Sequence, residues 1–359
     1  MNPPPSAPAS NAAEPRSGSE PVRYRRAPHL ALSWQGSATQ CIHAPSGRLF
    51  HVDDDIITVL SAATEPCILD DLRMRSGVDH AVVLAAVAAG LLVAEEADRL
   101  TDWNTYELAV QRLFGRGRAR FGLNDVRPRP ARLSPPPGTP IALDDIAAPP
   151  PKASFSEVLS ARRSVRRFAD SPLALSQLSR LLLDVLAVQH EDSTTGTWKR
   201  PTPSGGARHP LELYVAALNV ESLQRRCYYF DPVTRSLVPM AGTEELTIEV
   251  EDVSMNAMGL VDDGAGRPAP PAAVLMITAL YERTMHCYLD FALTLIHKDA
   301  GCLLQTLYLQ ATAQALAGCA IGAGPELHIA AGLGLDPNAQ GYVGGFALGA
   351  RVTDVAGAR

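Results

Sequence analysis

Four of the six residues at positions 162–167 are arginines, in the stretch SARRSVRRFAD between Ser160 and Asp170. A guanidinium group can form two parallel hydrogen bonds to a phosphate or a carboxylate, so clustered arginines are suited to hold one anion. On a continuous helix these side chains would form like-charged pairs four residues apart, which destabilise the helix. We therefore expect a helix to end near Ser164 and the chain to continue in an extended form. Arginines on both sides of the bend would then converge on an anion; a solvated basic surface is the alternative.

A second stretch, RPTPSGGARHP, comes directly before the apolar run LELYVAAL. Glycines without a Cβ let the backbone approach a flat ligand closely, and Ser204 adds a hydroxyl group beside them. The apolar run itself predicts a buried strand. The stretch is therefore either a ligand-binding turn or an ordinary loop that leads into a strand.

The composition excludes several classes of protein. The 359 residues are 46% hydrophobic and 19% charged, with a net charge of −6. Only one short segment is densely basic, whereas duplex-binding proteins spread Lys and Arg over a whole face, so we expect no nucleic-acid partner. The six cysteines form no CxxC pairs, which predicts no metal site and favours a reducing, cytoplasmic environment. The longest apolar run, at 81–94, is too short to cross a membrane, and we see no signal peptide.

The texture of the sequence divides the chain into four parts. Residues 1–26 are rich in Pro, Ser and Ala and are expected to be disordered. Residues 27–126 contain a hairpin signal, three short helical patterns and a strand pattern, which predict a winged-helix-like domain. This domain either docks a peptide or a partner or is a purely structural cap on the main domain. Residues 127–152 contain nine prolines and predict a stiff linker. Residues 153–359 form the second domain.

The second domain shows clear local signals. Ser154 and Glu157 match a capping box and predict the start of a helix. YYFDPVTRSLVPM reads as a hairpin, and DAGCLLQTLYLQATAQALAG predicts a long apolar helix that ends at Gly318.

In the first domain, the third helical pattern carries no Lys or Arg, which argues against a DNA-reading helix.

Five segments of the second domain, in order, resemble the nitroreductase superfamily: RRSVRRF, PSGGARHPLELY, YYFDP, RTMHCY and GCLLQTLYLQATAQALAGCAIGAG. The similarity is greater to the SagB/ThcOx-type branch, the FMN-dependent dehydrogenases of azole-forming peptide pathways. Members of that branch often carry an N-terminal winged-helix-like region as well. The resemblance implies an α+β fold, a mostly antiparallel sheet wrapped by helices, in a homodimer with FMN at its interface. The alternating patterns alone would also allow a doubly wound sheet.

The resemblance also implies which residues contact FMN. The arginine motif would contact the phosphate, ribityl chain and ring, and the Pro-Ser-Gly-Gly turn would reach the flavin from the partner subunit. The segment AIGAG would lie beside the reactive edge of the ring, where a backbone donor can stabilise negative charge. The implied cofactor contacts are Arg162, Arg163, Ser164, Arg166, Pro203, Ser204, Gly205, Gly206, Gln305, Gly322, Ala323 and Arg351. Arg167 is left as a surface charge.

The segment RTMHCY departs from the branch, which usually has a Lys-Tyr pair assigned to proton handling. This chain keeps Tyr288 but has Cys287 in place of the lysine. Azoline oxidation needs a base for the Cα proton while the Cβ hydride passes to N5 of the flavin. Tyr288, Cys287 and His209 are the candidate proton carriers. An inert buried cysteine and an ordinary loop histidine are the alternative interpretations of the last two.

Three functions remain open at this point. The favoured one is an FMN-dependent dehydrogenase that oxidises azoline-type rings of a peptide or peptide-derived substrate, is reoxidised by oxygen, and works with a cyclodehydratase or synthetase partner. The second is an NAD(P)H-dependent reductase of nitro, quinone or activated alkene groups, which the cysteine at position 287 favours. The third is a non-catalytic scaffold in a synthetase complex.

Overall fold

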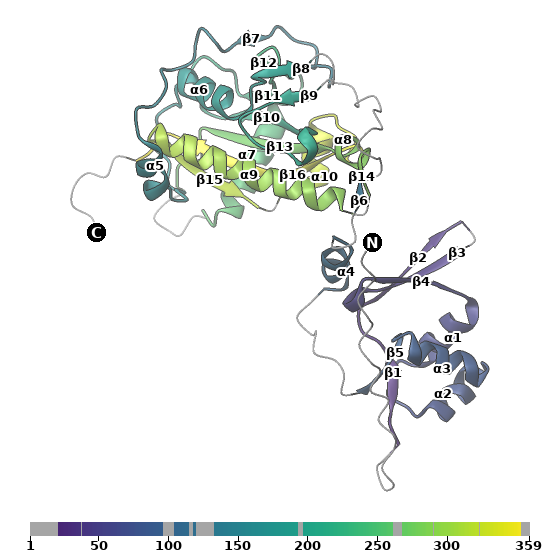
Figure 1. The fold of residues 1–359 in the computed structure, drawn as a ribbon. Coiled ribbons are helices and arrows are strands. Elements are labelled where there is room, and N and C mark those ends of the chain that lie inside the picture. Colours follow the sequence, from purple (N-terminus) through teal and green to yellow (C-terminus); the bar gives the residue numbers. More distant parts are fainter. Residues whose placement is uncertain are drawn as a thin grey trace. The chain divides into compact units, whose positions relative to one another are not determined.

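The chain forms two compact units, which divide between residues 116 and 117 (Figure 1). The computed structural model describes residues 21–36, 38–95, 104–114, 118–119, 133–192, 197–260, 268–289, 291–322 and 324–352.

The first unit contains a three-stranded antiparallel sheet, and three short helices, α1 to α3, follow this sheet in the sequence. Its strands, in spatial order, are β2 (Leu30–Gln35), β3 (Ala38–His43) and β4 (Arg48–Val52). Its helices are η1 (Ala44–Ser46), α1 (Asp54–Ala62), α2 (Leu69–Ser76), α3 (His80–Ala88) and α4 (Thr105–Phe114). Buried side chains of β3, β4 and α1 to α3 form one hydrophobic core. A separate two-stranded pair joins β1 (Tyr24–Arg26) to β5 (Leu92–Ala94).

The structure contains the local elements predicted for the first unit. The hairpin turn between β3 and β4 closes at Gly47, and α2 ends at Gly77; both glycines adopt the left-handed conformation that only glycine takes without strain. The predicted boundaries differ from the structure. Strand β1 lies inside the segment 1–26 that was expected to be disordered, because its backbone pairs with β5; residues 1–20 lie outside the described residues. The winged-helix-like assignment stays a prediction.

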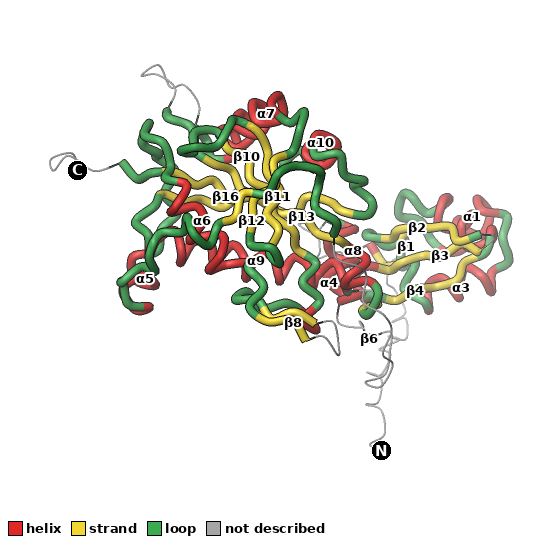
Figure 2. The backbone as a smooth tube through the Cα atoms, turned by 90° about the horizontal axis from the view of Figure 1, so that it is seen from above, coloured by secondary structure: helices red, strands yellow, loops and turns green. Residues whose placement is uncertain are grey.

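A seven-stranded, wholly antiparallel sheet forms the centre of the second unit (Figure 2). Its strands, in spatial order, are β15 (Ala317–Ile321), β16 (Gln340–Gly349), β13 (Ala273–Leu280), β10 (Leu211–Ala217), β11 (Arg226–Asp231), β12 (Ser236–Pro239) and β7 (Ile141–Ala142). Strand β7 lies inside the proline-rich segment predicted as a linker. Ile141 pairs with Leu237 of β12, so this part of the segment belongs to the sheet.

Helices cover both faces of the sheet. Helices α6 (Leu175–Leu186) and α9 (Ala292–Ala313) cover one face, and α7 (Glu244–Ala257) and α10 (Glu326–Gly332) cover the other. Alternate residues of β10 enter the two cores. The side chains of Leu213 and Val215 lie on the first face, and those of Tyr214 and Ala216 lie on the second. Burial on both faces explains the continuous apolar run of β13, AVLMITAL.

Smaller elements lie at the ends of this layered body. They are α5 (Phe155–Ala161), η3 (Gly205–Ala207), α8 (Tyr281–Met285), the pair β8 (His190–Asp192) with β9 (Thr197–Lys199), and the pair β6 (Arg118–Ala119) with β14 (Tyr288–Leu289). The β6–β14 pair places residues 118–119 with the second unit, whereas the first domain was predicted to run to 126.

Two predictions about helices have different outcomes. Helix α5 begins at the predicted capping box, in which the Ser154 amide donates to Glu157 over 2.8 Å, and it ends before the arginines. Helix α9 ends at Ala313, not at the predicted Gly318, because Ala315 turns into the left-handed region (φ +56°). Gly318 lies in β15, where a Cβ would overlap the ring of Phe346.

The predicted fold class is confirmed: the sheet is antiparallel and helices wrap it, so the doubly wound alternative is wrong. Among the described residues, no helix has the length and apolar content needed to cross a membrane.

Candidate active site

The arginine cluster begins where α5 ends. Arg162 caps the helix with extended backbone angles (φ −54°, ψ 122°), as the like-charge argument predicted. The next residues are held against the central sheet: the Val165 amide donates to the carbonyl of Gly318 in the edge strand β15 over 2.9 Å. The Ser164 hydroxyl is 2.9 Å from the hydroxyl of Tyr308 on α9, and the Arg162 guanidinium lies over the ring of this tyrosine.

Two arginines from distant parts of the chain line one pocket beside this segment. The pocket is lined by Arg163, Arg351, Val165, Tyr308, Thr312 and neighbouring apolar residues. A backbone bridge between Phe168 and Arg351 brings the end of the last strand to the arginine segment. The sequence resemblance had named both arginines, and the structure brings them together.

Among the described residues, no carboxylate forms an ion pair with Arg162, Arg163, Arg166, Arg167 or Arg351. Arg163 donates instead to the backbone carbonyls of Ser160 (3.0 Å) and Arg162 (2.8 Å). Arg166 is exposed and does not line the pocket. The region therefore has spare positive charge at a pocket, which is what an anion site needs.

The Pro-Ser-Gly-Gly stretch forms a tight turn, here called the Ser204–His209 turn, that packs on α9. Asp299 of this helix accepts two hydrogen bonds from adjacent residues of the turn: one from the Ser204 hydroxyl (2.6 Å) and one from the Gly205 amide (3.1 Å). The Ser204 oxygen in turn accepts from the His209 amide over 2.9 Å. Sequence reasoning missed Asp299, because nothing local links it to residues almost a hundred positions earlier.

The turn is held in an unusual conformation. Gly206 (φ +61°), Ala207 (φ +51°) and His209 (φ +46°) all lie in the left-handed region. A residue other than glycine costs about 1–2 kcal/mol there, so the surrounding contacts must hold the conformation. A Cβ at Gly206 would collide with the hydroxyl of Tyr288, which shows that this phenol lies directly against the turn.

The two adjacent candidates in the CY pair take different places. Tyr288 is half-buried in β14, and its ring meets that of Phe291 edge-on at 5.2 Å between centroids. Cys287 is buried, and its amide donates to the Thr284 carbonyl over 3.0 Å. The structure therefore brings the phenol, of these two groups, to the turn.

His209 is buried and hydrogen-bonded through three groups. Its ring Nε2 lies 2.9 Å from the carbonyl oxygen of Trp198. A carbonyl can only accept, so this ring nitrogen carries a proton. Its backbone carbonyl accepts from Arg283 over 2.9 Å, and its amide donates to Ser204. The Nε2 proton of this predicted proton carrier is therefore used in a hydrogen bond to the Trp198 carbonyl.

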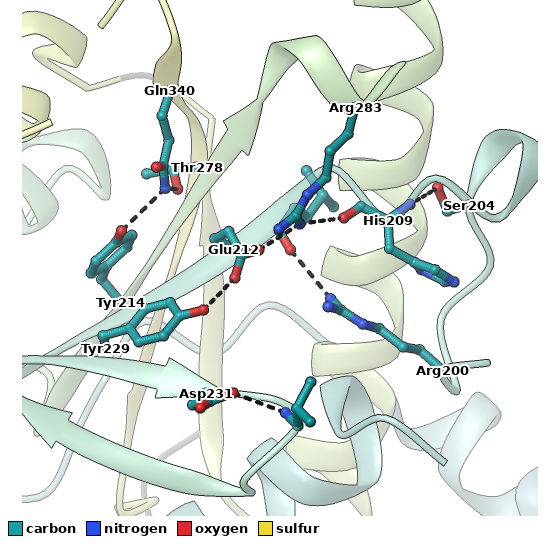
Figure 3. A network of polar contacts seen from close by, with 12 residues as sticks. Arg200, Ser204, His209, Glu212, Tyr214, Tyr229, Asp231, Thr278, Arg283 and Gln340 are labelled. Carbon is teal, nitrogen blue, oxygen red and sulfur yellow. Dashed lines mark hydrogen bonds and ion pairs between the residues drawn. The ribbon is translucent and has the colours of Figure 1, made fainter. Parts of the chain in front are cut away.

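A buried charge cluster lies behind the turn (Figure 3). Arg283 of α8 and Glu212 of β10 form an ion pair at 2.5 Å, and both side chains are 2% exposed. Glu212 also accepts from the Tyr229 hydroxyl over 2.9 Å. Arg200 stacks over the ring of Trp198, and burial lowers the pKa of its guanidinium, an effect that Glu212 opposes. Burial, reinforced by Glu212, raises the pKa of Tyr229.

The two parts of the site lie at different positions along α9. The turn packs against Leu295 and Asp299, whereas Tyr308 and Thr312 line the pocket that contains the two arginines. At 1.5 Å per residue, Asp299 and Tyr308 are separated by about 14 Å along the helix axis. The turn and the arginine pocket are therefore two separate regions of one chain.

Pro203, on the turn's N-terminal side, lines a pocket with Ser204, His209 and Asp299. The remaining predicted contacts are not brought to the turn or to the arginine pocket by any contact of the described residues. Gln305 is exposed on α9, and a Cβ at the exposed Gly322 would meet nothing within 4 Å. Ala323 lies outside the described residues.

Comparison with known proteins identifies the family of the second unit. The nitroreductase family matches residues 159–350. A protein of Methanocaldococcus jannaschii, named as a candidate nitroreductase, is 33% identical over 169 residues, which are 47% of this chain and 78% of the relative. Among solved structures, a candidate nitroreductase from Anabaena variabilis matches with a TM-score of 0.48 and 23% identity, over 59% of this chain and 42% of that chain.

A chain of the Escherichia coli microcin synthetase complex McbBCD, with truncated pro-MccB17 bound, matches with a TM-score of 0.41 and 20% identity, over 56% of this chain and 74% of that chain. The family match covers more than half of the chain, and the Methanocaldococcus relative is matched over most of its length. The chain therefore belongs to the nitroreductase family of flavin oxidoreductases.

Proposed function

We propose that this protein is an FMN-dependent dehydrogenase that oxidises azoline-type rings of a peptide-derived substrate to azoles, with oxygen as the final acceptor. The observation that carries the proposal is the contact between the Tyr288 hydroxyl and Gly206, because it places a candidate proton carrier at the turn expected to face the flavin.

The residues present fit FMN. Arg163 and Arg351 line one pocket and have no carboxylate partner among the described residues, and Ser164 offers a hydroxyl group nearby, which suits a phosphate. The two adjacent glycines in the Ser204–His209 turn carry no side chain of their own; Leu295 and Tyr288 occupy their Cβ directions, so a flat ring would approach this backbone from another side. Bound FMN would supply the acceptor for a hydride.

A homodimer would join these two regions into one site. The turn and the arginine pocket are about 14 Å apart along α9 within one chain. A second copy packed alongside α9 would bring the turn of one protomer to the arginines of the other. Gln305, exposed on α9, would then face the shared site.

Conversion of an azoline to an azole breaks two C–H bonds, one as a hydride and one as a proton. In this proposal Tyr288 takes or relays that proton, because its hydroxyl lies against the turn. Cys287 is buried beside it, and the Nε2 proton of His209 is committed to Trp198, so neither offers the same access. The first unit would dock the peptide or a cyclodehydratase or synthetase partner, and no nucleic acid is involved.

A second candidate function is an NAD(P)H-dependent reductase of nitro, quinone or alkene groups. It is favoured by the cysteine where the azoline-oxidising branch usually has lysine.

The visible absorbance spectrum of the purified protein tests both. Bound flavin that NADPH leaves oxidised without oxygen, and that an azoline peptide reduces, supports the dehydrogenase. Rapid bleaching by NADPH supports the reductase. A protein that takes up no FMN on reconstitution refutes both. In the Tyr288→Phe variant, reduction by the azoline peptide should slow while FMN stays bound.

A further inference from the structure

We propose that Asp299 is a positioning residue that holds the Ser204–His209 turn in the shape that binds the flavin. The inference rests on the proposed function, because FMN is the expected ligand of the turn. Asp299 belongs to none of the motifs that carried the resemblance, and it contacts the turn from a different element.

The contacts of Asp299 are specific to the start of the turn. Its two carboxylate oxygens are divided between two adjacent residues, with Oδ2 accepting from the Ser204 hydroxyl and Oδ1 from the Gly205 amide. Leu295, one helical turn earlier on α9, packs on the same glycine. A rigid helix therefore presents one apolar and one polar contact to the turn.

The charge of Asp299 sets the direction of the hydrogen bonds. The Ser204 hydroxyl has one proton, and a carboxylate can only accept it. The oxygen's lone pairs then remain available for the His209 amide, which donates over 2.9 Å. One carboxylate thus orders both ends of the turn, directly at Gly205 and through Ser204 at His209.

The environment of Asp299 agrees with this role. Asp299 is only 7% exposed, and it forms no ion pair with any described residue. Burial raises the pKa of the carboxyl, and the hydrogen bonds from Ser204 and Gly205 oppose that rise. The turn thus supplies the hydrogen-bond donors that this buried carboxylate needs.

The position of the turn decides the position of the proton carrier as well. Gly206, one residue beyond the anchored amide, touches the Tyr288 hydroxyl. If the anchor is lost, the left-handed residues that follow can relax, and the gap between the turn and the phenol changes.

Amide hydrogen exchange of the flavin-free protein tests the anchor without any cofactor. The Asp299→Ala variant should exchange the amides of the peptide covering 203–209 about tenfold faster or more, because two amides lose their ordered acceptors. Asp299→Asn keeps an oxygen for the Gly205 amide and should lie between Ala and wild type. Asp184→Asn is the control: this aspartate on α6 is also partly buried, and its hydrogen bond from Gln310 (2.6 Å) and its ion pair with Arg180 involve no residue of the turn.

FMN titration of the same variants separates positioning from general stability. The dissociation constant should rise about tenfold or more for Asp299→Ala, less for Asp299→Asn, and not for Asp184→Asn. Unchanged exchange and an unchanged dissociation constant in Asp299→Ala, with wild type binding FMN, overturn the inference. A loss of thermal stability without weaker FMN binding overturns it too. If wild type itself binds no FMN, the proposed function fails, and the exchange data alone decide whether Asp299 anchors the turn.

Discussion

The buried ion pair behind the turn predicts a large and specific loss of stability. Glu212→Gln keeps the shape of the side chain but removes the charge that faces Arg283 at 2.5 Å. Both side chains are 2% exposed, so water cannot replace the lost partner. Breaking a buried pair from one side costs about 3–5 kcal/mol of unfolding free energy. That is a large part of the roughly 5–15 kcal/mol that a typical domain has in total.

Urea unfolding followed by circular dichroism measures this loss. The matched control is Glu244→Gln, which breaks the pair with Arg226 at 2.9 Å, where the glutamate side chain is 49% exposed. An exposed pair contributes about 0–1 kcal/mol, so the control should lose at most about that much. The two variants therefore make the same chemical change at opposite degrees of burial.

A double-mutant cycle tests the reason for the effect. If Glu212 matters because it neutralises Arg283, then Glu212→Gln combined with Arg283→Met should lose clearly less stability than the two single losses added together. Full additivity, or a loss in Glu212→Gln no greater than in Glu244→Gln, would refute the reasoning from the ion pair.

Further predictions concern the turn, the pH and the thiols. Gly206→Ala should lose flavin binding and stability because its Cβ meets a tyrosine hydroxyl, whereas Gly242→Ala, with a similar φ of +73° and nothing within 4 Å, should show only the backbone strain in the same assays. Burial raises the pKa of Asp184 and of Asp299, so the folded state holds these protons to higher pH than the unfolded chain. The free energy of unfolding should therefore fall as the pH rises from the ordinary carboxyl range through the raised values, and the two Asn variants should show a smaller slope. A thiol reagent should modify the exposed Cys302 first, as read by mass spectrometry of the native protein, because the other five cysteines are buried; rapid reaction at any of those five would contradict the burial.

Local patterns predicted local structure well. The capping box at Ser154 and the hairpin glycine at position 47 were found where the sequence placed them, because each signal and its effect lie within a few residues. The end of α9 was predicted five residues too late, since an apolar helix and an apolar strand follow each other without a polar break. Gly318 was taken as a helix end, but packing against Phe346 is what requires a glycine there.

The candidate site was only partly visible in the sequence. The family resemblance indicated Arg163 and Arg351, and the fold brings them to one pocket. The partners of Asp299 and Arg283 could not be found in that way, because they lie some seventy to ninety-five positions away and only the tertiary fold joins them. Glu212 carried a usable signal: one carboxylate inside the apolar run LELYVAAL indicates a buried partner.

The long helix α9 imposes a constraint of phase as well as of distance. Successive residues of a helix are rotated by about 100°, so Asp299 and Tyr308, nine positions apart, point to nearly opposite sides of its axis. The same helix therefore supports the turn with one side and the arginine segment with the other. Adding or deleting one residue between them would rotate one support by about 100° relative to the other, while leaving every helical hydrogen bond able to form. Changes of length in this stretch should consequently be far more damaging than substitutions on its exposed face, although both leave the helix itself intact.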